Sequence, residues 1–582
     1  FMRYIFSYTN PQRHFIDIEC VIPAVRSDKL LVQLPSWRPG RYELGNFAKN
    51  IQKWEAFDEA GKKLKAKKIT KDSWEIITKG VGEVHVKYNY YASEINAGSS
   101  FLDEKQLYVN PVNCCLYVPE RIDEPCELEL VLPRDYIVGS GLKRVLKAGN
   151  TKNGLVFSTK DFHELADSPF IASNTLKHNE VVVSGLKFHL WFQGECTPDW
   201  TRLLNDFYIF IKEQLSAMKE FPSTEYHFLF QILPYRFYHG VEHLNSTVLA
   251  LGPGYNLMEN SLYDDLLGVC SHELYHAWNI KSIRPLEMMP YNYAKENYSR
   301  LGYVCEGVTT YYGDYFLFRS GVFNEQEYFQ TFNERLQKHF HNPARFTMAV
   351  TDASFDTWLD GYVPGIPARK TSIYDEGCLI AFFTDVLIRR KTKNKKSLDD
   401  VMLHLYNEFA KKGKGYSEDD YMSIVEQVAG DSLTDFFINY VYGTNDFEPM
   451  LQEQLAYIGC ELVKTKSKKY HEAYFGFKLQ EGIVPPKVAL VYPDSVADRA
   501  GLTANDEIIA INGHQVRNDL NEWKKYFAGG QIDLTVFSNT NLKTIRLLPS
   551  SGEHYLNYSV AKLKNATDGQ KQAYQSWAKR KF

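Results

Sequence analysis

Hydrophobic side chains recur at every second position through the first part of the chain. The stretches HFIDIECVI (residues 14–22) and EVHVKYNYYA (83–92) alternate apolar and polar residues, and turn-rich clusters such as PSWRPG (35–40) separate such stretches. This alternation is typical of strands that bury one face. It predicts an all-β domain that ends near residue 170.

Helical periods dominate the middle of the chain. Two apolar stretches with strand character, residues 181–192 and 226–233, enclose a helical pattern at 199–219. Farther on, SLDDVMLHLYNEFAKKG (397–413) starts with a serine N-cap and two aspartates and ends on lysines and a glycine. These are the signals of a helix that is capped at both ends. Strands and helices are therefore expected to pack together in this part.

Short strands and glycine turns return from about residue 470, and a polar, lysine-rich stretch with helical character follows them. The whole pattern predicts a multidomain α+β fold. We divide it into an N-terminal β domain (1–170), a mixed domain (171–385), a helical domain (386–465), a small β-rich module (466–550) and a C-terminal tail (551–582).

Composition narrows the classes of partner and compartment. The chain has 582 residues, 44% of them hydrophobic, and a formal net charge of -4 without a concentrated basic segment, so nucleic acid is not an expected partner. No apolar run reaches the roughly 18 residues of a transmembrane helix. The start lacks the apolar core of a signal peptide, which favours the cytoplasm, although a periplasmic or secreted chain after signal removal would look the same.

The stretch CSHELYHAWNIKSIRP contains an H-E-x-x-H pattern formed by His272, Glu273 and His276. On a helix, residues four apart lie about 40° apart around the axis and about 6 Å along it, so both imidazoles can reach one metal ion. Glu273 then projects beside that ion, where a base is useful. Because five-residue patterns also arise by chance, the interpretation needs a third ligand.

Glu306, in LGYVCEGVTTYYGDYF, is the best candidate for that ligand. A zinc site that keeps one position open for chemistry uses three protein ligands. Pro285 is expected to end the first helix, and a second helix after Gly302 could place Glu306 behind the metal. The alternative is that Glu306 only begins a helix, where its charge favours the helix dipole.

These motifs resemble those of the gluzincin metallopeptidases, which include the aminopeptidase N family. The extended string HELYHAWNIKSIRP, the block EGVTTYYGDY and the order of segments are most similar to the glycyl aminopeptidase family with a C-terminal PDZ domain. The resemblance implies one Zn²⁺ per chain, held by His272, His276 and Glu306, with Glu273 as general base. It also implies a β-sandwich-like N-terminal domain and a thermolysin-like catalytic domain that continues into the helical domain.

Tyr374, in Tyr374-Asp375-Glu376-Gly377, is the candidate donor to the oxyanion of the tetrahedral intermediate. The tetrad resembles the Tyr-x-Lys-Gly pattern of related aminopeptidases, with Glu in place of Lys. With 39 tyrosines in the chain, an arbitrary one is usually a packing residue. Only its place in this motif singles out Tyr374.

An aminopeptidase must also recognise the free amine of its substrate. The stretch His239-Gly240-Val241-Glu242-His243 resembles the Gly-x-Met-Glu-Asn motif of aminopeptidase N relatives. The resemblance places Glu242 on the amine-binding glutamate, while Gly240 and Val241 would offer backbone groups to an extended peptide. The alternative is an exposed carboxylate at the end of a strand.

The small module resembles a PDZ domain of the bacterial type in the strings YFGF and PDSVADRAGLTANDEIIAINGHQV. Backbone N–H groups of Phe475, Gly476 and Phe477 could hold the carboxylate of a C-terminal peptide. Structural docking of the module to its neighbours is the equal alternative.

The leading hypothesis is a zinc-dependent aminopeptidase that acts on peptides with a free N-terminus, and the family resemblance implies a preference for Gly and Ala. The alternatives are a zinc endopeptidase of related fold and a PDZ-based peptide-binding or chaperone-like adaptor. Two further family blocks, PSWRPGRYELGNFAKN (35–50) and ASFDTWLDGY (353–362), could serve interdomain packing.

Overall fold

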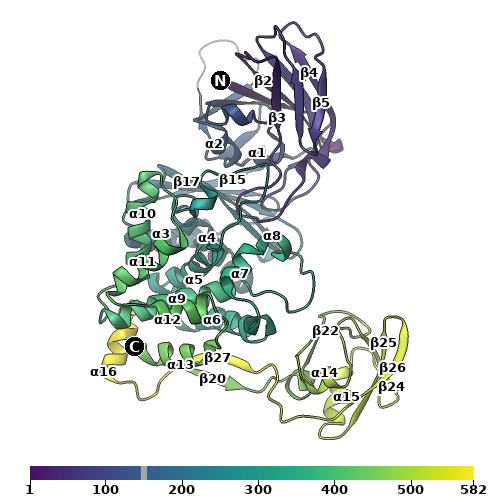
Figure 1. Cartoon of the computed structure of the whole chain (residues 1–582), viewed down its shortest axis with the longest axis vertical. Helices are drawn as coiled ribbons and strands as arrows, with labels where there is room; N and C mark the ends of the chain where they lie inside the picture. Colours follow the sequence, from purple (N-terminus) through teal and green to yellow (C-terminus); the bar gives the residue numbers. More distant parts are fainter. Residues whose placement is uncertain (146–153) are drawn as a thin grey trace.

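A computed structural model describes residues 1–145 and 154–582. A β domain lies at one end of an elongated molecule, a body of helices and one sheet fills the middle, and a small β-rich module lies at the other end (Figure 1). This arrangement confirms the multidomain α+β fold. Among the described residues, no helix is long and apolar enough to cross a membrane.

The N-terminal domain is built from sheets that are mostly antiparallel. Its largest sheet has seven strands in the order β12-β13-β10-β1-β2-β7-β4, in which only β1 and β10 pair in parallel. The strands of this sheet include β1 (Met2–Ser7), β4 (Ile51–Asp58), β10 (Cys126–Val131), β12 (Lys143–Arg144) and β13 (Gly154–Thr159). The alternating stretches of the sequence form two neighbours in it, β2 (Phe15–Ile22) and β7 (Val84–Tyr91), so the strand prediction is confirmed there. A three-stranded sheet faces the same core, with β3 (Lys29–Gln33), β6 (Ser73–Ile77) and β5 (Ala66–Thr70).

The middle body begins with a five-stranded sheet in the order β15-β16-β17-β19-β18. The helical pattern before β17 forms α3 (Trp200–Met218), which packs on the sheet. Strand β18 pairs with β19 alone and is therefore an edge strand, whose other side can accept an extended peptide. The strands are β15 (Lys177–Val183), β16 (Leu186–Gln193), β17 (Glu225–Ile232), β18 (Phe237–Glu242) and β19 (Ser246–Gly252).

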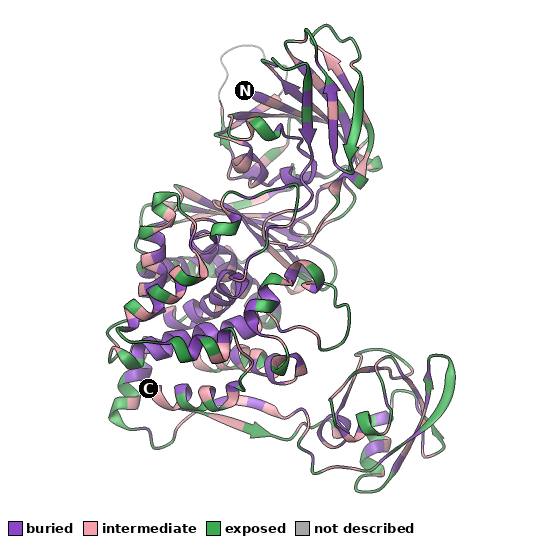
Figure 2. Cartoon of the chain, viewed as in Figure 1, coloured by how far each residue is buried: buried purple, intermediate pink, exposed green. Residues whose placement is uncertain are grey.

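Helices pack behind the sheet around the almost entirely buried helix α9 (Asp375–Lys391), as the purple ribbon at the centre of Figure 2 shows. The boundary expected at residue 385 falls inside α9, and one hydrophobic core runs from the sheet into the later helices. The catalytic and helical segments therefore share a core. The surrounding helices are α4 (Asn260–Tyr275), α5 (Thr309–Ser320), α6 (Glu325–Phe340), α10 (Leu398–Glu408), α11 (Glu418–Ala429) and α13 (Phe447–Tyr457).

The C-terminal stretch returns to this body instead of trailing away as a tail. Strand β27 (Asn557–Lys562) pairs with β20 (Cys460–Thr465), and α16 (Asp568–Ala578) follows it. The indole N–H of Trp577, on α16, donates to the Tyr311 hydroxyl at 2.9 Å. The charge-rich composition of this stretch predicted a tail, but Tyr574 and Trp577 of α16 pack in the core.

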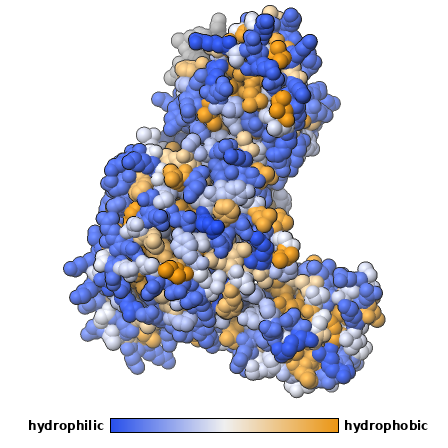
Figure 3. All heavy atoms as spheres, viewed as in Figure 1, coloured by the Kyte–Doolittle hydropathy of each residue, from blue (hydrophilic) through white to orange (hydrophobic). Residues whose placement is uncertain are grey.

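The small module is thus inserted between β20 and β27. It has its own core, formed by strands β21 (Phe477–Leu479), β22 (Val488–Val491), β23 (Glu507–Ile511) and β25 (Ile532–Ser538) and helix α15 (Leu520–Tyr526). Figure 3 shows that its surface on the viewed face mixes hydrophilic groups with scattered hydrophobic ones.

The N-terminal domain joins the body through aromatic packing. Trp37 lies 5.0 Å from Trp358 between ring centroids, and its indole N–H donates to the Asn292 carbonyl oxygen at 2.7 Å. The core of the N-terminal domain also takes in Ile280, which follows the H-E-x-x-H stretch, and Cys305, which directly precedes Glu306. The two family blocks at 35–50 and 353–362 therefore do pack domain against domain.

Candidate metal centre and catalytic site

Helix α4 presents the H-E-x-x-H residues at its C-terminal end. His272 and Glu273 lie in its last turn, and His276 follows as the C-cap residue, so the helix ends well before Pro285. The Nε2 atoms of His272 and His276 lie 3.1 Å apart. The Nδ1 atom of His276 faces the Asn279 carbonyl oxygen at 2.8 Å, a contact that fixes the proton on Nδ1 and leaves Nε2 free as a ligand.

Glu306 reaches the same point from a different helix. Its Oε2 atom lies 3.6 Å from Nε2 of His272 and 3.3 Å from Nε2 of His276. Tetrahedral ligands that bind zinc at 2.0–2.1 Å lie about 3.3 Å from one another, so these three donors fit a zinc ion. His276 and Glu306 are only 1% and 2% exposed, whereas His272 keeps 18% of its side chain exposed, which leaves one side of the centre open.

Glu306 lies on η6 (Tyr303–Val308), a turn of π-helix that leads into α5. Such turns open the backbone ladder and are frequent at functional sites. The buried amide of Asn279 donates to the Val304 carbonyl oxygen at 2.8 Å and to the Thr309 hydroxyl at 3.1 Å. Asn279 therefore ties the segment after the two histidines to the turn that carries the third ligand. Sequence reasoning missed this residue, which stands in the apolar string HAWNIK.

Two glycines set the position of Tyr374. A Cβ atom on Gly307 would lie 2.5 Å from the Gly377 backbone, so η6 and the first turn of α9 cross in backbone contact. This crossing holds Tyr374, the N-cap residue of α9, next to the turn of Glu306. Burial and the nearby Glu306 charge raise the pKa of Tyr374 well above its usual value. Its hydroxyl therefore remains a neutral donor.

Glu273 and Glu242 face the centre from two sides. One carboxylate oxygen of each, together with a nitrogen of His276, lies within a 4.8 Å cluster. Both side chains are buried, and Oε2 of Glu273 and Oε1 of Glu242 have no hydrogen-bond partner among the described residues. Burial raises the pKa of both carboxyls. Burial of a carboxylate oxygen without a hydrogen bond costs free energy, so both groups are candidates to bind a ligand.

Strand β18 carries the amine-site motif along its open edge. Gly240 faces Glu273 so closely that a Cβ atom there would lie 2.3 Å from Oε1 of Glu273. Val241 is buried against the N-terminal domain, and Glu242 ends the strand. The stretch around Gly240 therefore lies beside Glu273, the candidate base, and Gly240 itself adds no side chain on that side.

An ion-pair network behind Glu242 was not foreseen. The ammonium group of buried Lys281 lies 2.7 Å from Oδ1 of Asp167, and Nδ1 of His243 lies 3.0 Å from the same oxygen. The Leu244 N–H donates to the other oxygen at 2.9 Å. His243 is thus held by Asp167 and does not face a substrate. In the sequence, Lys281 stands among apolar residues, which indicates a buried charge, but its partner Asp167 is more than 100 positions away.

The N-terminal domain also contributes to the site. Gly40 has a φ of 91°, and a Cβ atom there would lie 2.5 Å from Oε2 of Glu242. The backbone of the loop PSWRPG therefore lies directly against the candidate amine anchor. The turn residues predicted a loop, but its partner could not be read from local pattern.

The predicted carboxylate loop of the small module has fewer free donors than expected. The Gly476 N–H donates to the His471 carbonyl oxygen at 2.9 Å, and the side chains of Phe475 and Phe477 lie in the module's core. One of the three proposed N–H groups is therefore already bonded within the chain.

Two other His/Glu groups lie on the sheet of the middle body and share His189. They consist of His178, Glu180 and His189, and of His189, Glu225 and His227. Most of their side chains are partly exposed, whereas the triad on α4 and η6 is largely enclosed. The enclosed triad is therefore the stronger candidate for a resident metal ion.

Three segments of the chain match models of known domain families. Residues 3–174 match the profile of the peptidase M61 N-terminal domain, 265–380 that of M61 glycyl aminopeptidase, and 487–536 that of a PDZ domain. No curated protein sequence matches the chain.

Among solved structures, an aminopeptidase N family protein from Idiomarina loihiensis is 27% identical, with 99% of this chain and all of that chain covered and a TM-score of 0.89. An M1 zinc metallopeptidase from Deinococcus radiodurans is 11% identical, with coverages of 74% and 90% and a TM-score of 0.44. A mutant of that enzyme bound to a Tyr-Ser-Ala substrate is 12% identical, with coverages of 76% and 94% and a TM-score of 0.46. Two segments thus match M61 family models and a third matches a PDZ domain, in the order that the sequence resemblance implied, and the whole fold matches that of the Idiomarina loihiensis protein, so the resemblance to the glycyl aminopeptidase family is confirmed.

Proposed function

We propose that this protein is a zinc-dependent aminopeptidase that removes N-terminal residues from peptides. The observation that carries the proposal is the buried carboxylate of Glu242, whose Oε1 has no hydrogen-bond partner among the described residues, beside a three-donor centre and Glu273, whose Oε2 has none either. The Glu242 carboxylate suits a substrate ammonium, and the Glu273 carboxylate suits transfer of a proton. The match to the glycyl aminopeptidase family supports a preference for small N-terminal residues such as Gly and Ala.

His272, His276 and Glu306 would hold one zinc ion, which when bound acidifies water and polarises a carbonyl group. Glu273 would take the proton from the attacking water and pass it to the leaving amine. Its raised pKa suits this exchange, because the carboxyl binds a proton more readily than an exposed one. Tyr374 would donate its hydroxyl proton in a hydrogen bond to the oxygen that becomes negative.

The surroundings of Glu242 favour an exopeptidase over an endopeptidase. A peptide that pairs antiparallel to β18 has its N-terminus where β18 ends, at Glu242. The backbone at Gly40 lies against the carboxylate there. An endopeptidase needs a cleft that continues past this point, and the N-terminal loop occupies that space.

The decisive experiment combines zinc analysis of the purified full chain with cleavage of Gly-amide and Ala-amide, with and without a chelator. We expect one zinc per chain, loss of activity on chelation, and loss of most activity in Glu273→Gln, which keeps the shape of the side chain. Zinc-free active protein, or full activity in Glu273→Gln, would reject the mechanism.

A second assay separates the endopeptidase alternative. Acetylation of the substrate amine removes the charge that Glu242 would pair, so cleavage should fall to the background level. If acetylated and free peptides are cleaved equally, and Glu242→Ala is as active as the parent, the protein is an endopeptidase.

A further inference from the structure

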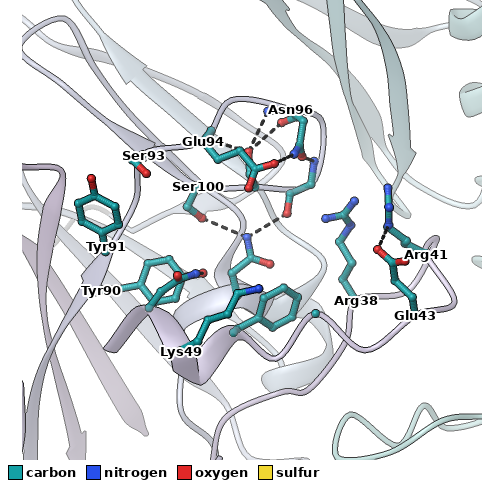
Figure 4. Close-up of a pocket in the computed structure, with 16 residues that line it drawn as sticks. Arg38, Arg41, Glu43, Lys49, Tyr90, Tyr91, Ser93, Glu94, Asn96 and Ser100 are labelled. Carbon is teal, nitrogen blue, oxygen red and sulfur yellow. Dashed lines mark hydrogen bonds and ion pairs between the residues drawn. The ribbon is translucent and has the colours of Figure 1, made fainter. Parts of the chain in front are cut away.

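Arg38 has a guanidinium group without a hydrogen-bond acceptor among the described residues. It belongs to the loop of the N-terminal domain that passes Glu242, and the Glu242 carboxylate is near enough to favour its charged form. Its Nε atom is fully shielded from solvent and has no partner. In Figure 4 its guanidinium group points into the open space of a cavity, and no dashed line leaves it.

The cavity has a volume of about 260 Å³ and lies between the loop that carries Arg38 and a turn that contains Asn96. Two carboxylates line the cavity, and each has a hydrogen bond to another side chain. Glu43 accepts from Nε of Arg41 at 2.5 Å, and Glu94 accepts from the side-chain amide of Asn96 at 2.7 Å. Neither of them has a hydrogen bond to Arg38.

The loop that carries Arg38 also reaches the proposed cleavage site. Gly40, in the same loop, contacts Glu242, and the Arg41 guanidinium lies 4.5 Å from the Tyr362 ring. Next to the turn of Asn96, Nδ1 of His239 on β18 accepts from the Ala97 N–H at 3.2 Å. Burial and the charges of Arg38 and Arg41 lower the pKa of His239 to about 3, so this side chain is neutral and adds no positive charge.

A guanidinium group that faces a cavity and has no acceptor among the described residues is available to an anionic ligand. The guanidinium fork is the geometry that binds a carboxylate through two parallel hydrogen bonds. We propose that Arg38 binds a carboxylate on the part of the substrate that follows the cleaved bond. This proposal rests on the proposed aminopeptidase function.

Such a carboxylate has two sources: the free C-terminus of a short peptide, or an acidic side chain near the new N-terminus. In either case the substrate is held at both ends by opposite charges, its ammonium by Glu242 and its carboxylate by Arg38. The site would then prefer short or acidic peptides over long neutral ones.

The test measures binding by calorimetry to the full chain loaded with zinc and carrying Glu273→Gln, which retains uncleaved peptides. One pair of ligands is Ala-Ala and its C-terminal amide, and the second is Ala-Glu-amide and Ala-Gln-amide. We expect the carboxylate member of one pair to bind roughly 10- to 100-fold more tightly, as a charge-assisted pair does. Preference in the first pair identifies a C-terminus, and preference in the second an acidic side chain.

Arg38→Gln should reduce that preference to less than about twofold, and Arg38→Lys should keep part of it, because lysine retains the charge without the fork. Arg13→Gln, on an exposed arginine of the same domain, is the matched control and should keep the full preference. The thermal midpoint of Arg38→Gln should equal or exceed that of the parent, whereas a purely structural arginine would lower it.

Equal binding within both pairs, or no binding of any of these peptides, overturns the proposal. Cleavage of Ala-amide by the parent together with equal binding in both pairs rejects the Arg38 site alone. An Arg38-dependent preference in a protein that cleaves neither Gly-amide nor Ala-amide would instead retain the carboxylate site and reject the proposed function.

Discussion

Gly40→Ala should impair recognition of the substrate amine although it changes no charge and no residue of the catalytic domain. The added Cβ atom would lie 2.5 Å from Oε2 of Glu242, whereas ordinary contacts begin at 3.4 Å. The carboxylate must therefore retreat by about 0.9 Å, and misplacement of a binding group by about 1 Å can cost on the order of 100-fold in rate. We expect kcat/KM for Ala-amide to fall by about that factor.

Backbone strain must be separated from this contact. Gly40 has a φ of 91°, a region that costs a residue with a Cβ atom roughly 1–2 kcal/mol. Gly61 has a φ of 80° and no heavy atom within 4 Å of its added Cβ, so Gly61→Ala carries the strain without the contact. It should lose stability to a similar extent and keep its activity.

The same variant can be combined with Glu242→Ala. If Gly40→Ala acts through Glu242, the double variant should be no less active than Glu242→Ala alone, because the carboxylate is already gone. Additive losses, or equal losses of activity in Gly40→Ala and Gly61→Ala, would refute the proposed contact.

Three further outcomes follow from the geometry. His272→Ala should lose the bound zinc in metal analysis after dialysis, whereas His189→Ala, in a more exposed His/Glu group, should keep it. Asn279→Ala should weaken zinc binding by roughly 10- to 100-fold in a competition with a chromophoric chelator, since its amide holds the turn of the third ligand. Asp167→Asn should lower the free energy of unfolding in urea by roughly 3–5 kcal/mol at pH 7, because Lys281 is left buried and unpaired. Burial opposes ionisation of Asp167, but Lys281 outweighs it and lowers the pKa, so this stabilisation is present above about pH 4 and the difference should shrink as the pH falls below it.

Features with a local physical cause could be predicted from the sequence. Strand alternation located β2 and β7, and the capping signals located α10, whose N-cap Ser397 forms the expected capping box. The H-E-x-x-H spacing depends on one helix, so the local pattern was enough to predict two of the three candidate metal ligands, His272 and His276. Glu306 and Tyr374 required motif resemblance, since their approach depends on a crossing between helices that no periodicity reveals.

Features made by long-range packing could not be predicted. The stretch after residue 550 was expected to be a tail, because its lysines dominate its composition, but β27 and the aromatic side chains of α16 return it to the core. Asn279 and Lys281 stand two positions apart in the string HAWNIK, and no local pattern predicts the role of either of them. Their functions depend on partners that stand far away in sequence, at Val304 and Asp167.

The metal centre and the recognition of a chain end have different structural origins. His272, Glu273, His276 and Glu306 all stand on helices of the middle body. The end of the cleft at Glu242 is instead closed by the N-terminal domain, through the backbone of its tight loop.

Asp167 strengthens this junction, because it binds both Lys281, beyond the metal-binding helix, and His243, directly after Glu242. The carboxylate that would select a free amine is therefore fixed by the same contacts that dock the two domains. Since the H-E-x-x-H pattern lies wholly on one side of that junction, it can predict hydrolysis but not where along a peptide the hydrolysis occurs. If the proposed function holds, exopeptidase selectivity is a property of the domain interface.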